Sequence, residues 1–361
     1  MLSTVYVVGA GASAGTLGSN VAPCSADFGK TLTIVLPDWQ KKFPHLAKVV
    51  QRMVRQNRIK PLDWSLETVW TTIDNRLKLI PITRDALLKE ESSDDLLMAD
   101  FELKQASCYI YGERTSSHLE RETDRLGVLK HELSGMSVAS CVVSFNYDLL
   151  VESVLLQPGK KFSLTRDSVK ALDPGTIEFV KPHGSVSWKR FLYRQENAII
   201  DEVQFLERPV SLLETRYGLN PQPEIQPGIV GPVPFKDELL WNKDDKFSEI
   251  LRQQWKRALS SLRQAREIVV MGYAFPAEDY SQALLAQEML RERRSLRALL
   301  VVELAQIRDH FLADLSAHSD RADKAPVGLP LAALASNVLP KVHRRPLRHS
   351  LSVTMQSLST G

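Results

Sequence analysis

TVYVVGAGASAG, at residues 4–15, places a run of β-branched and aromatic residues directly before a glycine-rich segment. A short apolar run of this kind is typical of a strand buried on both faces, as in a parallel sheet. The pattern G-x-G-x-x-A at Gly9, Gly11 and Ala14 matches the dinucleotide-binding fingerprint. In that fingerprint glycines let the backbone approach a diphosphate at a helix N-terminus. A tight strand–helix turn without a ligand is the alternative, and the pattern alone leaves it open.

Buried strands and helices continue to alternate further along the chain. Strands are expected at Val138–Phe145, Ile268–Met271 and Leu299–Val302, and an amphipathic helix over residues 247–262. Such alternation predicts an α/β fold with a Rossmann-like, doubly wound and mostly parallel sheet. Residues 157–180 are expected to form a hairpin or loops, and the proline- and glycine-rich residues 206–240 long loops.

A helical block interrupts this pattern. Apolar residues recur at helical spacing in two segments. The first contains Leu46, Val49, Val50 and Met53. The second follows an expected N-cap at Ser65 and contains Leu66, Val69, Trp70 and Ile73. We therefore expect a helical insertion or cap module at 37–135 within a Rossmann-like nucleotide-binding core made of 1–36 and 136–305. Residues 306–361 are a C-terminal extension and a candidate interaction segment.

The composition is that of a folded chain. Among 361 residues, 43% are hydrophobic and 25% charged, which excludes disorder for the bulk of the chain. The net charge of +3 is too small to indicate nucleic-acid binding by itself. No apolar run approaches the ~18 residues of a membrane helix, and no basic stretch precedes the first apolar residues, so neither a membrane span nor a signal peptide is expected.

The cysteines bear on metal binding and compartment. Cys24, Cys108 and Cys141 form no CxxC pair, so a four-cysteine zinc site is excluded and no metal is expected. An odd, sparse set of cysteines fits a reducing compartment better than a disulfide framework. The expected location is the cytoplasm.

Two polar motifs lie between the expected strands at 138–145 and 268–271. Asn146 and Asp148, in SFNYD at 144–148, come directly after a buried strand, where ligands of doubly wound sheets sit. An Asx turn that caps the next helix is the alternative. His183, in KPHGS at 181–185, can exchange a proton near neutral pH beside a glycine. A hydrogen-bonded turn histidine is its alternative reading.

A fourth motif ends the strand at 268–271, where Gly272 and Tyr273 follow in IVVMGYAFP; an ordinary structural turn is its alternative. Taken together and in this order, VVGAGAS, SFNYDLLVE, KPHGSVSW and IVVMGYAFPAEDY closely resemble the bacterial sirtuin-like family. Each motif alone is weak, whereas the ordered set, spread over residues 4–303, is specific.

The resemblance implies an NAD+-binding core with an inserted helical module. It implies catalytic roles for Asn146 and His183, and a contact of Asp148 with nicotinamide or its ribose. The residues expected to bind the rest of the nucleotide are Gly9, Ala10, Gly11, Ala12 and Ser13 at the diphosphate, and Gly272 and Tyr273 at the late nucleotide-binding turn.

The chain departs from many relatives at two positions. It has Ala274 where they have serine, and Glu303 where their last strand ends in asparagine. A carboxylate can accept both hydroxyls of a ribose, so Glu303 is expected at the adenosine ribose; capping a helix is the alternative. These departures concern the adenosine side and not the reaction centre.

The missing cysteine pairs decide between reactions within the family. Sirtuin deacylases carry a four-cysteine zinc module, which this chain cannot build, so the resemblance favours an NAD+ glycohydrolase that releases nicotinamide and ADP-ribose. It further implies a regulated role in anti-phage defence, controlled by homo-oligomerisation or a partner protein, with nucleic acid reached only through a partner. The alternatives are a non-hydrolytic NAD+ or ADP-ribose-binding module and, less favoured, a deacylase or ADP-ribosyltransferase.

Overall fold

The structure is a computed structural model. It describes the backbone of residues 4–17, 21–79, 92–121, 133, 136, 140–156, 161–164, 176–195, 198–217, 224–231, 246–273, 295–300 and 351–355.

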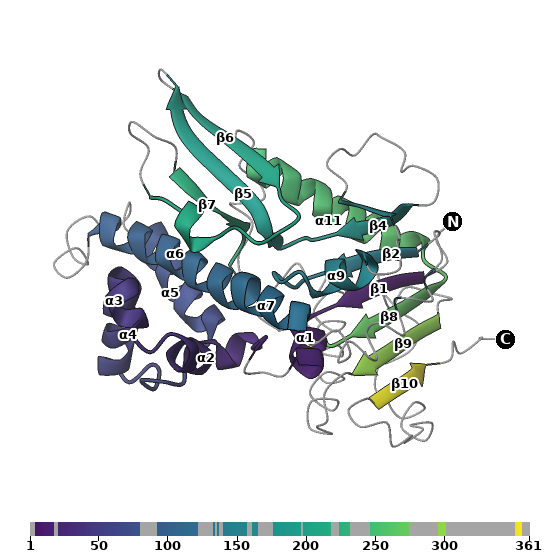
Figure 1. Ribbon diagram of the computed structural model, residues 1–361, viewed down its shortest axis with the longest axis horizontal. Coiled ribbons are helices and arrows are strands. Elements are labelled where there is room, and N and C mark those ends of the chain that lie inside the picture. Colours follow the sequence, from purple (N-terminus) through teal and green to yellow (C-terminus); the bar gives the residue numbers. More distant parts are fainter. Residues whose placement is uncertain are drawn as a thin grey trace.

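A seven-stranded sheet has the order β10-β9-β8-β1-β2-β4-β3 and occupies the right-hand part of the molecule in Figure 1. Every neighbouring pair is parallel except β10 with β9, which confirms the predicted α/β fold with a mostly parallel sheet. The strands are β1 Thr4–Val8, β2 Ser140–Ser144, β3 Lys161–Leu164, β4 Thr176–Val180, β8 Glu267–Met271, β9 Ser295–Leu300 and β10 Leu351–Met355.

The register of the central strands aligns their carboxyl ends. Val8, the last residue of β1, pairs with Ser144 of β2 on one side and with Met271 of β8 on the other. Beyond β2, Val143 pairs with Val180 at the end of β4. The segments that leave these four strands therefore start at one edge of the sheet. Parallel strands of this kind place ligands at that edge.

Two segments of the chain differ from the sequence prediction. Residues 157–180, expected as a hairpin or loops, contain β3 and β4, which pair in parallel and so cannot form a hairpin. The residues 206–240, expected as long loops, contain β7 (Glu224–Ile229) and a short 3-10 helix, η4 (Leu212–Glu214).

A second, three-stranded antiparallel sheet in the order β6-β5-β7 lies above the large one in Figure 1. Its other strands are β5 Gly184–Gln195 and β6 Ala198–Phe205. Helix α11 (Lys246–Gln264) packs Phe247, Ile250 and Leu251 against Trp188 of β5. This is the apolar helix face that the sequence predicts at 247–262, and it joins the two sheets.

Helices occupy the described part of residues 37–121, where no strand occurs. They are α3 Trp39–Lys42, α4 Pro44–Arg55, α5 Leu66–Leu79, α6 Ser93–Cys108, the π-helical turn η2 Tyr109–Arg114 and α7 Thr115–Arg121. The remaining helices near the site are α1 Ala10–Leu17, η1 Ser25–Asp27, α2 Phe28–Val35 and α9 Leu150–Leu156. The expected cap is present, because Ser65 Oγ accepts a hydrogen bond from Thr68 N at 3.0 Å.

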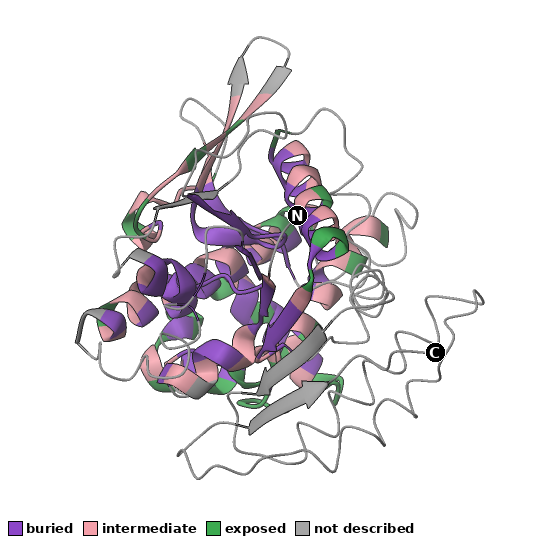
Figure 2. Ribbon diagram, turned by 90° about the vertical axis from the view of Figure 1, so that its right-hand side faces the viewer, coloured by how far each residue is buried: buried purple, intermediate pink, exposed green. Residues whose placement is uncertain are grey.

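One continuous helix, α6–η2–α7, runs from the helical block towards the large sheet (Figure 1). Leu103 and Ala106 of its first part belong to the hydrophobic core of the helical block. Leu119 of its last part belongs to the core of the parallel sheet. The buried residues of Figure 2 accordingly extend from the sheet into the helices. None of the described helices is both long and apolar enough to cross a bilayer.

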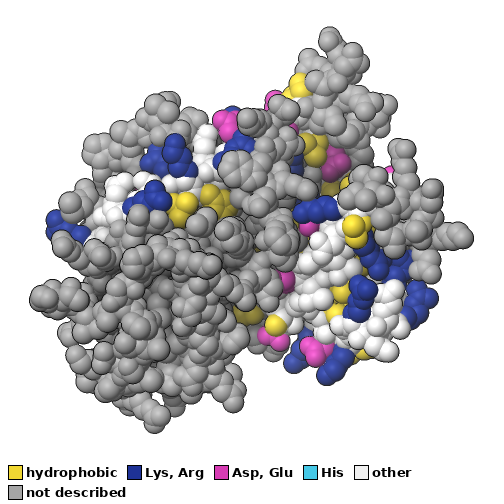
Figure 3. Space-filling view, turned by 180° about the vertical axis from the view of Figure 1, so that it is seen from behind, with side chains coloured by type: hydrophobic (Ala, Val, Ile, Leu, Met, Phe, Trp, Pro, Cys, Tyr) yellow, Lys and Arg dark blue, Asp and Glu magenta, His cyan; other side chains and the backbone are white. Residues whose placement is uncertain are grey.

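The charges of the described surface are mixed. On the face of Figure 3, Lys and Arg side chains are interspersed with Asp and Glu side chains among the residues that are drawn in colour. This distribution agrees with a net charge of only +3.

Candidate active site

The glycine run after β1 packs directly on the turn after β8. Gly9 N donates to Met271 O at 2.9 Å, and Gly11 N donates to Gly272 O at 2.8 Å. A Cβ on Gly9 would lie 2.5 Å from the ring of Tyr273. These glycines are therefore required by the contact between two strand ends, and the amides of Gly9 and Gly11 already have acceptors within the protein.

Gly272 is constrained even more closely. Its φ is +60°, a conformation that side chains rarely adopt, and a Cβ there would lie 1.9 Å from Ala12 N. Ala12 is fully buried under this turn. The first turn of α1 and the residues 272–273 thus form one compact edge of the site.

Asn146 follows β2 and lies against α1. Its side chain is buried, with Nδ2 donating to the buried Ser13 Oγ at 2.9 Å. Its Oδ1 is also buried and accepts a hydrogen bond from none of the described residues. A buried acceptor without a partner costs about 1–3 kcal/mol. That cost is recovered when a ligand or water donates to Oδ1, so this atom has the properties of a ligand contact.

Asp148 has the helix-capping role that was one of the two readings of the sequence. Its Oδ1 accepts from Leu150 N at 3.0 Å, so it does cap α9. It also lies, 3% exposed, two residues beyond Asn146 and within reach of Ser13. Burial raises the pKa of Asp148 above its ordinary value, while the charge of Lys181 and the hydrogen bonds from Leu150 and Ser13 oppose that rise.

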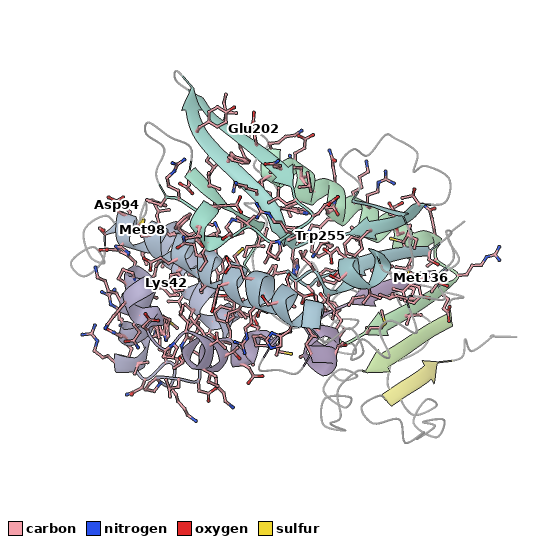
Figure 4. The ribbon with its side chains drawn as sticks, in the orientation of Figure 1. Lys42, Asp94, Met98, Met136, Glu202 and Trp255 are labelled. Carbon is pink, nitrogen blue, oxygen red and sulfur yellow. The ribbon has the colours of Figure 1, made fainter. Side chains whose placement is uncertain are left out.

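His183 follows β4 and lies in an aromatic environment. Its ring meets Phe145 edge-on at 5.0 Å between centroids and lies 5.9 Å from Trp255 of α11. Phe145 in turn stacks on Tyr273 at 4.4 Å. Figure 4 labels Trp255 near the centre of the molecule. Phe145 therefore links the histidine to the turn after β8, and this joins the loops after β2, β4 and β8.

The helical block reaches the site through η2. Tyr111 of this π-turn lies 5.7 Å, between ring centroids, from Tyr147. Tyr147 donates a hydrogen bond to Val230 O, and its own carbonyl accepts from Val186 N at 3.0 Å. The residue between Asn146 and Asp148 is thereby fixed by the helical block and by the antiparallel sheet.

Most of the residues that the sequence singles out converge in this way. Asn146, Asp148 and His183 follow β2 and β4, and the glycine run and residues 272–273 follow the adjoining β1 and β8. Ala274 and Glu303 lie outside the described residues. Among the residues that are described, no group of three or more His, Cys, Asp or Glu could hold a metal ion.

Sequence analysis missed Phe145, Trp255 and Lys181 as parts of the site. Phe145 and Lys181 stand inside the two polar motifs, so position was the available signal. The sequence gave no signal for Trp255, because on the apolar face of α11 this residue is indistinguishable from a core residue.

Part of the sequence matches a known protein family. The SIR2-like domain family matches residues 140–315. Among solved structures, a Sir2 homolog–NAD complex is 15% identical, with a TM-score of 0.33, covering 88% of this chain and 90% of that chain. A Sir2 homologue mutant–ADP ribose complex is 13% identical, with a TM-score of 0.33, covering 82% of this chain and 78% of that chain. No curated protein matches the sequence.

The fold and the site define an α/β protein with a candidate site at the carboxyl ends of parallel strands. Residues 140–315 match the SIR2-like domain family, so this part of the chain is a SIR2-like domain. The resemblance drawn from its four motifs is thereby confirmed.

Proposed function

We propose that this protein is an NAD+ glycohydrolase that cleaves the bond between nicotinamide and ribose, giving nicotinamide and ADP-ribose. The observation that carries the proposal is the state of Asn146. Its Nδ2 is held by Ser13, while its buried Oδ1 has no donor among the described residues. His183 lies on the loop after the neighbouring strand, and both belong to a SIR2-like domain.

The positive charge of the leaving group explains why the reaction needs few catalytic side chains. Nicotinamide in NAD+ carries a positive charge and departs without protonation, so the transition state resembles an oxocarbenium ion at the ribose. Asn146 Oδ1 accepts a hydrogen bond from the attacking water or a ribose hydroxyl. His183 acts as the base towards that water or hydroxyl. A positioned base contributes roughly 10²–10⁴-fold in rate, and a fixed dipole roughly 10²–10³-fold.

The surrounding residues are assigned to binding. Asp148 accepts from the carboxamide of nicotinamide or contacts its ribose. The N-terminus of α1, with Gly9 to Ser13, lies beside the diphosphate, whose charge a helix N-terminus favours. Because Gly9 N and Gly11 N already donate within the protein, the helix dipole carries this contact. Gly272, Tyr273 and Glu303 lie towards the adenosine side.

The aromatic side chains around His183 surround the proposed reaction centre with apolar groups, which supports the proposal. Phe145, Trp255 and Tyr273 are all less than a tenth exposed. A low-dielectric environment strengthens the interaction of Asp148 and of the Asn146 dipole with developing positive charge.

Asn146→Ala and His183→Ala test these roles. Each variant should lower the rate of nicotinamide release by at least ~10²-fold, measured by chromatography of the products. Asn75→Ala, on the exposed face of α5, and His118→Ala, on α7, are matched controls expected to retain the wild-type rate. Wild-type turnover in both site variants would contradict the assignment. Saturable NAD+ binding without nicotinamide would instead favour the non-hydrolytic module.

We further propose that the activity is held off until a signal arrives, as in an NAD+-depleting effector of anti-phage defence in the cytoplasm. Unrestrained hydrolysis of NAD+ harms the cell that makes the enzyme. Homo-oligomerisation or a partner protein is the proposed control, with the helical block and residues 306–361 as candidate contact regions. Assays at several protein concentrations test this, because assembly-dependent activity rises more steeply than concentration.

A further inference from the structure

Lys181 is fully buried directly beneath the site. Its side chain is 0% exposed, and it comes immediately after β4. Its Nζ donates to Glu152 Oε1 at 2.7 Å, to the carbonyl of Asp148 at 2.7 Å and to Ser185 Oγ at 3.0 Å. An ammonium has three protons to donate. All three protons of the ammonium therefore have acceptors, as a buried charge requires.

These acceptors belong to three different segments of the site. Asp148 lies in the loop after β2, Glu152 on α9 and Ser185 at the start of β5. The backbone of Lys181 is also fixed, because its amide donates to the buried Gln254 Oε1 of α11 at 2.8 Å. Lys181 consequently ties the loop that carries Asn146 to the loop that carries His183, which lies two residues further along the chain.

The local charge is unbalanced around this lysine. Two carboxyl groups, Asp148 and Glu152, face one ammonium, and all three side chains are buried. Burial raises the pKa of both carboxyls, and the charge of Lys181 opposes the rise for both. The buried Glu152 Oε2 accepts a hydrogen bond from none of the described residues. Removal of the ammonium would leave two buried carboxyls without a counter-charge, which is strongly unfavourable.

We propose that Lys181 is a positioning residue of this active site, which locks the Asn146 and His183 loops together and supplies the positive charge beside Asp148 and Glu152. The inference rests on the proposed function, because it gives Lys181 a role in the same reaction. Lys181 does not contact the reacting atoms; it acts through the Asp148 carbonyl, through Ser185 and through its charge. The other groups that face Asp148 are Glu152 from α9, Ser13 from α1 and Tyr111 from η2.

Two single variants distinguish this role from a purely structural one. Lys181→Met keeps the length of the side chain and removes its charge, so Asp148 should ionise only at higher pH. Glu152→Gln removes the competing negative charge, so Asp148 should ionise at lower pH. The acid limb of the pH profile of kcat/KM for nicotinamide release should therefore move in opposite directions. At neutral pH, kcat of Lys181→Met should fall by about 10²-fold, as for a misplaced reacting group.

The double variant Lys181→Met with Glu152→Gln keeps the test decisive if the single lysine variant does not fold. It leaves one carboxyl and no ammonium, so it should fold and show an acid limb between those of the single variants. Lys189→Met is the matched control: Lys189 lies on β5 and pairs with Glu214 of η4, so its loss should leave the acid limb in place.

The outcomes separate two kinds of failure. Acid limbs that stay fixed, or that move in the same direction, in folded variants would overturn the role of Lys181 while the proposed function stands. If the wild type releases no nicotinamide, the proposed function fails, and the same pH series is read from NAD+ affinity by calorimetry. If the acid limb of NAD+ affinity moves in opposite directions in the two single variants, the role of Lys181 is supported; if it does not, that role is overturned.

Discussion

Asp148 shows how one residue serves the fold and the site at once. Its carboxylate caps α9 through Leu150 N, and Lys181 holds its carbonyl. The side chain is nevertheless buried beside Asn146 at a cost, since burial raises its pKa above the ordinary value. Such a cost is typical of residues that are placed for function more than for stability.

Asp148→Asn should therefore stabilise the protein at neutral pH while lowering nicotinamide release. A carboxyl whose folded pKa is raised contributes stability below its unfolded pKa and loses it as the pH rises through the folded pKa. Asparagine keeps an oxygen for Leu150 N and never ionises. The difference in Tm, variant minus wild type, should grow as the pH rises from about 4 towards the raised pKa of the folded state. A difference that is constant or shrinks over this series would argue against an unfavourable Asp148 charge.

The sequence was enough to single out Asn146 and His183 as candidates, because the first follows an expected buried strand and the second stands beside a glycine in a short polar motif. It could not reveal that Asn146 is oriented by Ser13 or that Lys181 lies beneath both loops. These contacts join segments far apart in the chain, such as Asn146 with α1, and only the register of β1 with β2 brings them together.

Among the elements, the turn after β8 is the most constrained part of the site. Gly272→Ala would force a side chain into the left-handed region, which costs about 1–2 kcal/mol, and would place its Cβ 1.9 Å from Ala12 N. The two effects add, so the loss of unfolding free energy should exceed about 1–2 kcal/mol. The urea midpoint should fall without a change in the m-value. The measurement is urea unfolding followed by circular dichroism.

Gly112→Ala is the control for this prediction. A Cβ there would meet the side chain of Pro209 at 2.8 Å, within a helical turn where alanine is favoured over glycine. Its midpoint should fall less than that of Gly272→Ala. Equal losses in the two variants would mean that the contact between the first turn of α1 and residue 272 carries no special constraint.

Elements with a clear apolar period were predictable, and those defined by distant pairing were not. β1, β8, α4 and α11 carry runs or stripes that local sequence makes plain. The β5–β6 hairpin went unpredicted, because residues such as Lys189 and Arg190 interrupt its alternation and are neutralised by Glu214 and Asp201. β10 depends on an antiparallel edge contact with β9, which no local pattern encodes.

At the scale of the whole molecule, the cysteines report on global unfolding. Cys108 and Cys141 are fully buried, and Cys24 is half-buried. Burial raises the pKa of all three thiols, so little reactive thiolate is present near neutral pH. Iodoacetamide should modify Cys24 slowly, and Cys108 and Cys141 only when the chain unfolds, as measured by mass spectrometry of native and denatured samples. Rapid modification of Cys108 in the native sample would contradict the packing around it.

The π-turn η2 sets the rotational phase between the two hydrophobic cores. Thr115 Oγ1 donates to Ile110 O at 3.1 Å, five residues back, across this widened turn. A π-turn holds one residue more than the α-helical turn of about 3.6 residues, so the flanking helices keep nearly the phase of a single α-helix. Leu103 and Leu119 therefore reach their two cores from one uninterrupted helix. A homologue that lacks the additional residue can close the turn to α-helical geometry and keep both interiors, so a one-residue gap is tolerable at this point of the chain.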